Sequence, residues 1–350
     1  MKYTRETLKL HVLSPSLFTP TSLENALEKL AFVQADPIRS PARAQDLILR
    51  HRVKDYYTGD LEKHYPSLPL EEDYLYAHGF MVRDIWRLLH PRNNVKLTKF
   101  DREVLAAAQE LGEILPKSLD NRFKPKRVSN WWGGHSQATK MALERLHYYG
   151  FLRIARRQKG LRIYQTFTPL VSSLSPEKRL EKLIMAIVRI LAPVTDTTLT
   201  SSLHRLRNHF GPPRPAIETL LKTGELEKQT VDGINYLTPA GDRTTIGMQS
   251  FVKFLAPFDP LVWDRRRFEH LWRWPYRFEA YTPKEKRVRG YYAMPLLWNT
   301  EIIGWANVNV VNNKLTVDLG FVKNRPKSKR FENELSQEIS NMKSFLKLNS

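Results

Sequence analysis

A glutamine and an aspartate one residue apart are the clearest candidates for chemistry. They lie in the stretch FVQADPIRSP at residues 32–41. In an extended chain, side chains at positions i and i+2 point to the same side, so Gln34 and Asp36 can face one pocket. There the carboxylate can accept a proton from a water molecule that the amide orients by a hydrogen bond. Such a pair is suited to hydrolysis at an electron-poor carbon.

A purely structural role is the alternative for this pair. Pro37 keeps Asp36 out of the α-helical region, so the aspartate can simply end a helix while Gln34 is a polar surface residue. The tripeptide alone does not decide between the two interpretations.

The elements expected on both sides of the pair are helices. Residues 22–38 predict one helix with Ser22 as its N-cap, and residues 41–65 predict another. The chain from Gln34 to Ser40 must then turn between them. The apolar face of the first helix consists of Leu23, Ala26, Leu27 and Leu30.

Length and composition restrict the number of domains and the kinds of chemistry that this protein can have. The 350 residues exceed one ordinary domain, and 41% hydrophobic residues suffice for a buried core. The absence of cysteine excludes disulfides, Cys-ligated zinc and Cys-ligated iron–sulfur clusters. Neither a long apolar run nor an apolar N-terminal block is present. We therefore expect a cytoplasmic, nucleoid-associated protein.

The charge is strongly positive and uneven. The formal net charge is +20, from 56 Lys and Arg against 36 Asp and Glu. Residues 116–165 hold twelve basic and two acidic residues, a net +10, which is half of the total in one seventh of the chain. Such an excess favours a nucleic acid, because bound phosphates release their condensed counterions. A solubilising or ribosome-associated surface is the alternative.

A weak internal repeat occurs at an offset of 74 residues. Residues 141–169 align with residues 215–239, and each copy reads as a helix, a glycine and two strands. This order is the back half of a winged helix. The first hairpin, RIARRQKGLRIYQ, is basic, as a wing that contacts phosphates would be; the second is nearly neutral. Chance alignment of two helix–hairpin segments is the alternative.

The pattern after residue 247 predicts a β-meander and a final helix. Turns are expected at Asn299-Thr300 and at Asn312-Asn313, between strand-like runs. Residues 331–346 predict a helix that packs on this sheet. Its apolar face consists of Phe331, Leu335, Ile339, Met342 and Leu346.

Several segments together resemble a known family over nearly the whole chain. They are FVQADPIRSPARAQDLILRHR, DYLYAHGFM, WWGGHSQATKMALERLHYYGFLRIARR and, most specifically, the arginine-aromatic block at residues 251–298. In this order and spacing they resemble the bacterial winged-helix DNA glycosylases that unhook interstrand crosslinks, of the AlkZ/YcaQ type. Gln34, Ala35 and Asp36 match the catalytic motif of the aspartate-containing QxD subgroup, although Ala35 is smaller than the residue expected there.

The resemblance implies an α+β fold of tandem winged helices followed by a β-rich domain, C-shaped with a basic concave face. The implied domains are an N-terminal winged-helix-like domain with the catalytic motif at residues 1–115, a basic second winged helix at 116–175, a third at 176–246, and a C-terminal β domain with a closing helix at 247–350.

The resemblance also implies an activity. The chain is expected to be a monofunctional, metal-free and cofactor-free glycosylase that hydrolyses the N-glycosidic bond of N7-alkylguanines in double-stranded DNA, including nitrogen-mustard-type crosslinks. Asp36 is expected to stabilise the oxocarbenium-like sugar and act as base, and Gln34 to position the water. Neither a membrane nor an obligate protein partner is expected, and a monomer suffices.

Further site residues are expected on a weaker basis. His78 matches a family histidine and is a pocket candidate, with a buried structural role as the alternative. Arg265, Arg266 and Arg267 are expected to contact phosphates or to pair with nearby acids. The complete set of expected DNA-binding residues is Gln137, Thr139, Lys140, Arg156, Arg157, Lys159, Arg265, Arg266 and Arg267.

Two other functions are compatible with this sequence. A non-catalytic winged-helix transcription regulator would bind DNA without needing Asp36 after binding, and a structural RNA-binding protein would prefer RNA to duplex DNA.

Overall fold

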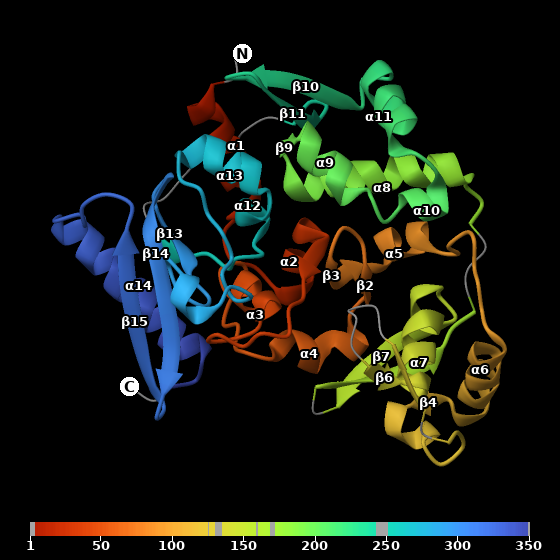
Figure 1. The fold of residues 1–350 in the computed structure, drawn as a ribbon. Helices are drawn as coiled ribbons and strands as arrows, with labels where there is room; N and C mark the ends of the chain where they lie inside the picture. The colour runs from red at the N-terminus through yellow and green to blue at the C-terminus, as the bar shows by residue number, and fades with distance from the viewer. Residues whose placement is uncertain are drawn as a thin grey trace. The chain divides into compact units, whose positions relative to one another are not determined.

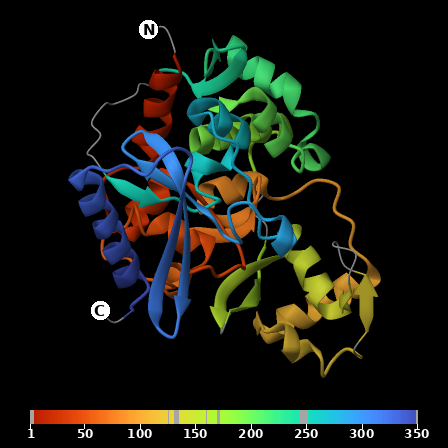
Figure 2. The ribbon, with the colours of Figure 1, turned by 60° about the vertical axis from the view of Figure 1, so that its left-hand side comes forward.

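The computed structural model describes residues 4–124, 126–129, 135–158, 160–168, 172–242 and 251–348. The chain forms two compact units. Unit 1 comprises Met1–Leu61, Ile184–Ser202 and Ile217–Ser350, and unit 2 comprises Glu62–Leu183 and Leu203–Ala216. Each unit therefore combines stretches that are distant in sequence (Figures 1 and 2). The four consecutive domains expected from the sequence remain a prediction.

The first helices of unit 1 lead directly into the Gln34–Asp36 segment. Helix α1 (Arg5–Ser16) is followed by α2 (Leu23–Leu30), where the Ser22 hydroxyl accepts the Asn25 N–H at 3.2 Å as an N-cap. Helix α2 ends at Ala31, which has a left-handed φ of 58°, and strand β1 (Phe32–Gln34) follows. The predicted helix over residues 22–38 is therefore wrong beyond Leu30, because burial of both Phe32 and Val33 favours a strand there.

The predicted helix over residues 41–65 is interrupted. The structure has α3 (Ala44–Leu49) and α4 (Asp60–His64), with non-helical chain between them. The buried Asp46 carboxylate explains the interruption: it accepts the Tyr56 hydroxyl at 2.7 Å and the Gly59 N–H at 3.1 Å. A continuous helix would place these two donors elsewhere and leave a buried acceptor without them.

The C-terminal part of unit 1 confirms the predicted meander. Strands β12 (Val252–Phe254), β13 (Met294–Trp298), β14 (Glu301–Val311) and β15 (Lys314–Phe321) form an antiparallel sheet in sequence order. Its turns contain Asn299, Asn312 and Asn313, all with positive φ. Helix α14 (Lys329–Phe345) lies along the sheet (Figure 1), and its Glu338 accepts the Phe254 N–H at 2.8 Å.

Two short helices between β12 and β13 join the sheet to the rest of unit 1. They are α12 (Pro260–Trp263) and α13 (Arg265–Trp272), and the 3-10 turn Lys284–Lys286 follows. Asp264 caps α13 and also accepts the Thr195 N–H at 3.0 Å and the Thr198 hydroxyl at 2.8 Å. This carboxylate thereby attaches α13 to β9 (Val194–Thr195) and α9 (Asp196–Ser202).

Unit 2 combines short antiparallel ribbons with helices. Its elements are the 3-10 turn Tyr65–Ser67, β2 (Leu70–Tyr74), β3 (His78–Val82), α5 (Arg83–Leu89), α6 (Lys99–Leu111), β4 (Glu113–Ile114), the 3-10 turn Pro116–Leu119, β5 (Arg127–Ser129), β6 (His135–Gln137), α7 (Ala138–Tyr148), β7 (Leu152–Gln158), β8 (Leu161–Thr166) and α10 (Arg207–Phe210). Helices α8 (Pro176–Leu191) and α11 (Pro213–Lys222) each continue from unit 2 into unit 1.

Both copies of the sequence repeat have the predicted order of elements. Helix α7 is followed by Gly150 (φ 81°) and the β7–β8 hairpin, and α11 by Gly224 (φ 74°) and the hairpin of β10 (Leu226–Val231) and β11 (Ile234–Pro239). Helices and antiparallel ribbons together confirm the α+β class. Within the described residues, no helix has the length and apolarity needed to cross a membrane.

Substitution of Arg52 by methionine should destabilise unit 1 strongly. Arg52 and Asp259 form a fully buried bidentate pair, with distances of 2.8 and 2.9 Å, so the substitution leaves an uncompensated buried carboxylate. We expect a loss of about 3–5 kcal/mol. Thermal unfolding followed by tryptophan fluorescence measures it. The exposed Arg325–Glu332 pair gives the control, since Arg325→Ala should cost less than about 1 kcal/mol. Equal decreases of the melting temperature in the two variants would contradict this expectation.

Candidate active site

Gln34 and Asp36 lie outside any helix. Gln34 is the last residue of β1, Asp36 follows two residues later in irregular chain, and both side chains are partly buried. The left-handed Ala31 ends the preceding helix three residues before Gln34. The pair therefore does not serve as a helix terminus.

The Gln34 side chain is oriented by a tryptophan. The indole Nε1 of Trp263 donates a hydrogen bond to the Gln34 Oε1 at 2.8 Å. Because an indole N–H can only donate, it determines which end of the amide faces the ring. The NH₂ group of Gln34 is consequently the end directed away from Trp263, where it can donate to a ligand or a water.

Trp263 is in turn held by the buried pair that begins α12. The Asp259 carboxylate accepts the Leu261 N–H at 3.1 Å as the N-cap of this one-turn helix, which ends at Trp263. Arg52 neutralises Asp259 and also donates to the Ser16 and Ile48 carbonyl oxygens, each at 2.7 Å. The orientation of Gln34 thus depends on contacts between residues more than 200 positions apart.

The Asp36 carboxylate is in an environment that disfavours its charge. Burial raises the pKa of Asp36 above its ordinary value, and the Ile38 N–H, which donates to Oδ1 at 2.9 Å, partly opposes this rise. That hydrogen bond arches over Pro37 and holds the carboxylate in position. A half-buried carboxylate with a raised pKa is a better proton acceptor than an exposed one.

The charge of Asp36 acts on two tyrosines that the sequence prediction omitted. Burial, followed by the negative charge of Asp36, raises the pKa of Tyr292 well above its usual value, and the same two causes raise the pKa of Tyr281. Both hydroxyls therefore remain protonated and can act as donors. Their signal in the sequence is the cluster of aromatics in RFEAYTPKEKRVRGYY at residues 277–292.

The three consecutive arginines have different surroundings. Arg267 is fully buried, and its guanidinium donates to the carbonyl oxygens of residues 191, 193, 260 and 261. Arg265 donates to the Val262 and Pro257 carbonyl oxygens, each at 2.8 Å. Both guanidinium groups are thus engaged by the fold, and Arg266 is the exposed member of the three.

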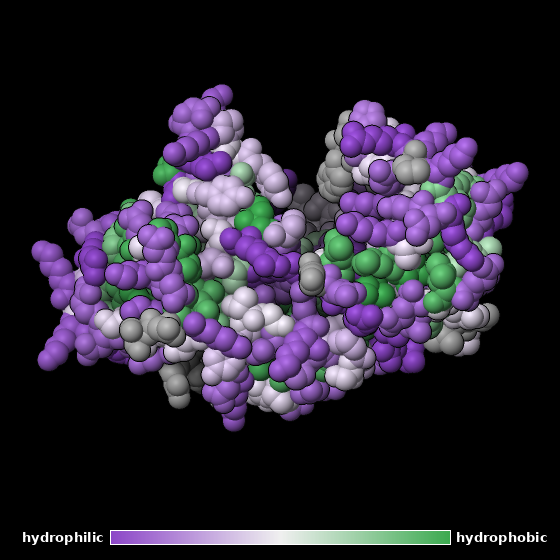
Figure 3. Space-filling view, turned by 90° about the horizontal axis from the view of Figure 1, so that it is seen from below, coloured by the Kyte–Doolittle hydropathy of each residue, from purple (hydrophilic) through white to green (hydrophobic). Residues whose placement is uncertain are grey.

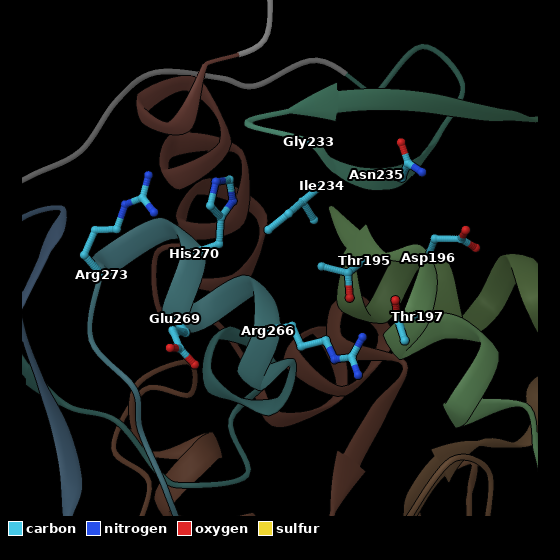
Figure 4. Close-up of a pocket in the computed structure, with 10 residues that line it drawn as sticks. All are labelled: Thr195, Asp196, Thr197, Gly233, Ile234, Asn235, Arg266, Glu269, His270 and Arg273. Atoms are coloured by element: carbon cyan, nitrogen blue, oxygen red, sulfur yellow. The ribbon is translucent and has the colours of Figure 1, made fainter.

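Arg266 lines an open cavity of about 590 Å³ in unit 1. The cavity lies between the start of α9, the β10–β11 turn and α13, and Figure 4 shows Arg266 directed toward Thr197. His270, on the same helix, bonds to the Tyr236 hydroxyl at 2.7 Å and lies 3.2 Å from Asp232. Of the three arginines, Arg266 is thus the one that lines this open cavity.

His78 belongs to an ion cluster in unit 2. Its Nε2 lies 3.2 Å from Glu72 and 2.7 Å from Arg162. Arg157 also donates to Glu72, at 2.6 and 3.0 Å. Burial by itself would raise the pKa of Glu72, but Arg162, His78 and Arg157 outweigh it and hold that pKa well below its ordinary value. The expected pocket role of His78 remains a prediction.

The remaining predicted DNA contacts lie at the start of α7 and on the hairpin after it. Gln137 and Lys140 are exposed, whereas Thr139 is buried. Arg156 pairs with Glu113 at 2.9 Å on the surface, and such exposed pairs are worth at most about 1 kcal/mol, so a phosphate can replace the acid. Lys159 lies outside the described residues.

The surface in Figure 3 is largely hydrophilic, and hydrophobic side chains appear there as separate patches. Trp272 and Trp274 are buried in the core of unit 1, and Trp131 and Trp132 lie outside the described residues. In the described part of the chain, no three His, Asp or Glu side chains are grouped so as to hold a metal ion.

Comparisons with known proteins agree with this architecture. The model of the family described as "DNA glycosylase AlkZ-like" matches residues 27–345. Among solved structures, the DNA glycosylase AlkZ of Streptomyces sahachiroi superposes with a TM-score of 0.66 at 13% sequence identity, over 99% of this chain and 97% of that one. At this identity the likeness concerns the fold. The family match covers most of the chain, and the protein therefore belongs to the AlkZ-like DNA glycosylase family.

Proposed function

We propose that this DNA N-glycosylase releases N7-alkylguanine from double-stranded DNA and unhooks nitrogen-mustard-type crosslinks, with Asp36 as catalytic base and Gln34 as the residue that positions water. The observation that carries the proposal is the hydrogen bond from Trp263 to the Gln34 oxygen, beside a half-buried carboxylate two residues further on. The QxD assignment of Gln34, Ala35 and Asp36 belongs to the same proposal.

The orientation of Gln34 defines how a water would be held. Since the Gln34 oxygen already accepts the Trp263 N–H, its NH₂ group donates to one lone pair of the water oxygen. The water donates one of its hydrogens to Asp36, and its second lone pair is left to attack the sugar. The two side chains therefore have separate tasks: Gln34 donates a hydrogen bond to the water, and Asp36 accepts one from it.

The reaction balances without a strong acid. As the bond between sugar C1′ and guanine N9 breaks, its electron pair neutralises the positive charge of the N7-alkylated ring, so the base departs uncharged. The Asp36 carboxylate stabilises the positive charge that develops on the sugar. The water oxygen then bonds to C1′ while its proton passes to Asp36. Such general base catalysis is typically worth about 10²- to 10⁴-fold.

DNA binding is proposed to involve exposed basic and polar residues. Lys140 and Gln137 open α7, where helix N-terminal amides can also contact phosphates. Arg156 can exchange its surface partner for a phosphate, and Arg266 lines an open cavity. Arg267 is omitted from this set, because its buried guanidinium donates only to carbonyl oxygens among the contacts described.

Substitution of Asp36 by asparagine should abolish base release while DNA binding persists. We expect a fall of about 10²- to 10⁴-fold in single-turnover release of N7-methylguanine from a duplex. The melting temperature should be unchanged or higher, because the raised pKa means that the ionised carboxylate costs stability at neutral pH.

Asp318→Asn, an exposed carboxylate on β15, is the matched control and should keep full activity. Full release by Asp36→Asn would remove the basis for the mechanism. Tight binding of undamaged duplex with no release by the unmodified protein would favour a non-catalytic regulator instead.

Removal of the indole donor should impair catalysis without unfolding the protein. In Trp263→Phe the Gln34 amide loses the bond that orients it, so the rate of release should fall by about tenfold while KM changes little. Trp298→Phe is the matched control, since it also deletes an indole hydrogen bond, to Glu334 at 2.8 Å, elsewhere in unit 1. Equal rates in the two variants would show that Gln34 does not need orienting.

The rate of release should fall as the pH is lowered, with a midpoint above 3.8, the ordinary pKa of an aspartate. Asp36 acts as a base only when it is ionised. Burial raises the pKa of Asp36, so the carboxylate is protonated at a higher pH than an exposed aspartate. An N7-alkylated base needs no protonation, so no second group compensates. Single-turnover rates between pH 4 and 8, corrected for spontaneous loss of the base, test this. If the Asp36→Asn variant still showed the same fall in rate at low pH, a group other than Asp36 would be responsible for it.

A further inference from the structure

A buried hydroxyl in unit 1 has no hydrogen-bond partner among the described residues. It belongs to Tyr292, whose side chain is only 2% exposed. A buried polar group without a partner is costly, and proteins seldom retain one without a reason. Because burial and the charge of Asp36 keep this hydroxyl protonated, it is a donor that lacks an acceptor.

Tyr292 is part of an aromatic cluster that extends to the surface. The Phe278 ring contacts Tyr292 edge-on, with centroids 5.3 Å apart, and Tyr281 at 6.0 Å. Phe258 also packs on Phe278, with ring centroids 4.9 Å apart. Tyr281 is 79% exposed and Tyr291 is 42% exposed, although aromatic rings of this size are usually buried. Exposed aromatics in one cluster, of which Tyr281 also senses the charge of Asp36, indicate a surface for a ligand.

The segment that carries these rings is held firmly. One oxygen of the buried Glu279 accepts three consecutive backbone N–H groups, those of Val288, Arg289 and Gly290, at 2.8–3.1 Å. The Asn307 side chain donates to the Arg289 carbonyl oxygen at 2.7 Å. Gly290 has a φ of 130°, and a Cβ there would lie 2.2 Å from Asn307, so no other residue fits without a shift. The tyrosines are therefore presented by a preorganised loop.

One ring of the cluster already has a cation over its face. The Arg287 guanidinium lies 5.0 Å from the centroid of Tyr291, and its Nε donates to the Thr282 carbonyl oxygen. Electron-rich aromatic faces attract cations, most strongly when both are removed from water. This contact shows that the loop can offer a ring face to a planar delocalised cation.

We infer that Tyr281, Tyr291 and Tyr292 form a cradle for the positively charged purine of the lesion, in which Tyr281 stacks on the ring. The Tyr292 hydroxyl, which solvent does not reach in the free protein, is uncovered as the base enters and donates to one of its acceptor atoms. The inference rests on the proposed function of Asp36. In this inference, the aromatic faces make the site selective for a positively charged base over an uncharged one. The base also provides the acceptor that the buried Tyr292 hydroxyl lacks in the free protein.

The first test removes only the hydroxyl. Tyr292→Phe should lower single-turnover release of N7-methylguanine by about tenfold, since the bond to the base is lost, while the melting temperature stays the same or rises because a buried unpaired hydroxyl is removed. Unchanged release in Tyr292→Phe would overturn its assigned role. A fall in rate accompanied by a marked fall in melting temperature would also overturn it, because Tyr292 would then be a structural residue.

The second test measures recognition of the charge. In an Asp36→Asn background, in which release is expected to be slow, we compare binding of duplexes that carry N7-methylguanine or its uncharged isostere 7-methyl-7-deazaguanine. The preference for the charged base should shrink by about tenfold in Tyr281→Leu and persist in Tyr281→Phe. Tyr57→Leu, an exposed tyrosine whose ring faces Lys347, is the control and should keep the preference.

The outcomes separate this inference from the function on which it rests. If the unmodified protein releases N7-methylguanine but Tyr281→Leu keeps its preference for the charged base, the cradle is wrong and the proposed mechanism stands. If the unmodified protein does not release N7-methylguanine at all, the proposed function fails first, whatever the tyrosine variants do.

Discussion

The buried pair of Arg52 and Asp259 is the constraint on which the proposed active site depends. Two charges withdrawn from water are stable only when every donor and acceptor is matched. Here the guanidinium contacts both carboxylate oxygens and two backbone carbonyl oxygens, and the carboxylate also caps α12. This geometry places Trp263 at the end of that helix, and Trp263 orients the Gln34 amide. A charge pair in the core thereby controls a polar group at the site.

The arginine-aromatic block at residues 251–298 contributes mainly to the scaffold. Asp264 joins α13 to β9 and α9, and Arg265 and Arg267 fasten the same segment through carbonyl oxygens. Residue types that suggest phosphate contacts from the sequence are thus used to hold α12 and α13 in place. The positive charge of the chain as a whole favours a polyanion, whereas the guanidinium groups of these two arginines donate to backbone carbonyl oxygens.

The site keeps polar groups in unfavourable states before any substrate is present. Burial disfavours the ionised form of Asp36, and the Tyr292 hydroxyl is buried without a partner in the described chain. Groups of this kind reduce stability and persist where function requires them. In the proposed mechanism, substrate binding gives both groups a partner. The positive charge that develops on the sugar attracts the Asp36 carboxylate, and the base accepts a hydrogen bond from the Tyr292 hydroxyl. Substrate binding would then relieve the cost that folding alone leaves.

The sequence by itself determined the residue pair, the α+β class, the C-terminal meander and its final helix, because these follow from local spacing and turn chemistry. It misassigned the chain after Leu30, where burial of Phe32 and Val33 outweighs helix periodicity. Only the tertiary structure decided that Trp263 orients Gln34 and that the charge of Asp36 acts on Tyr292. These interactions join segments more than 200 residues apart. A local sequence pattern cannot predict them, because it contains no information on which distant side chains come together in the fold.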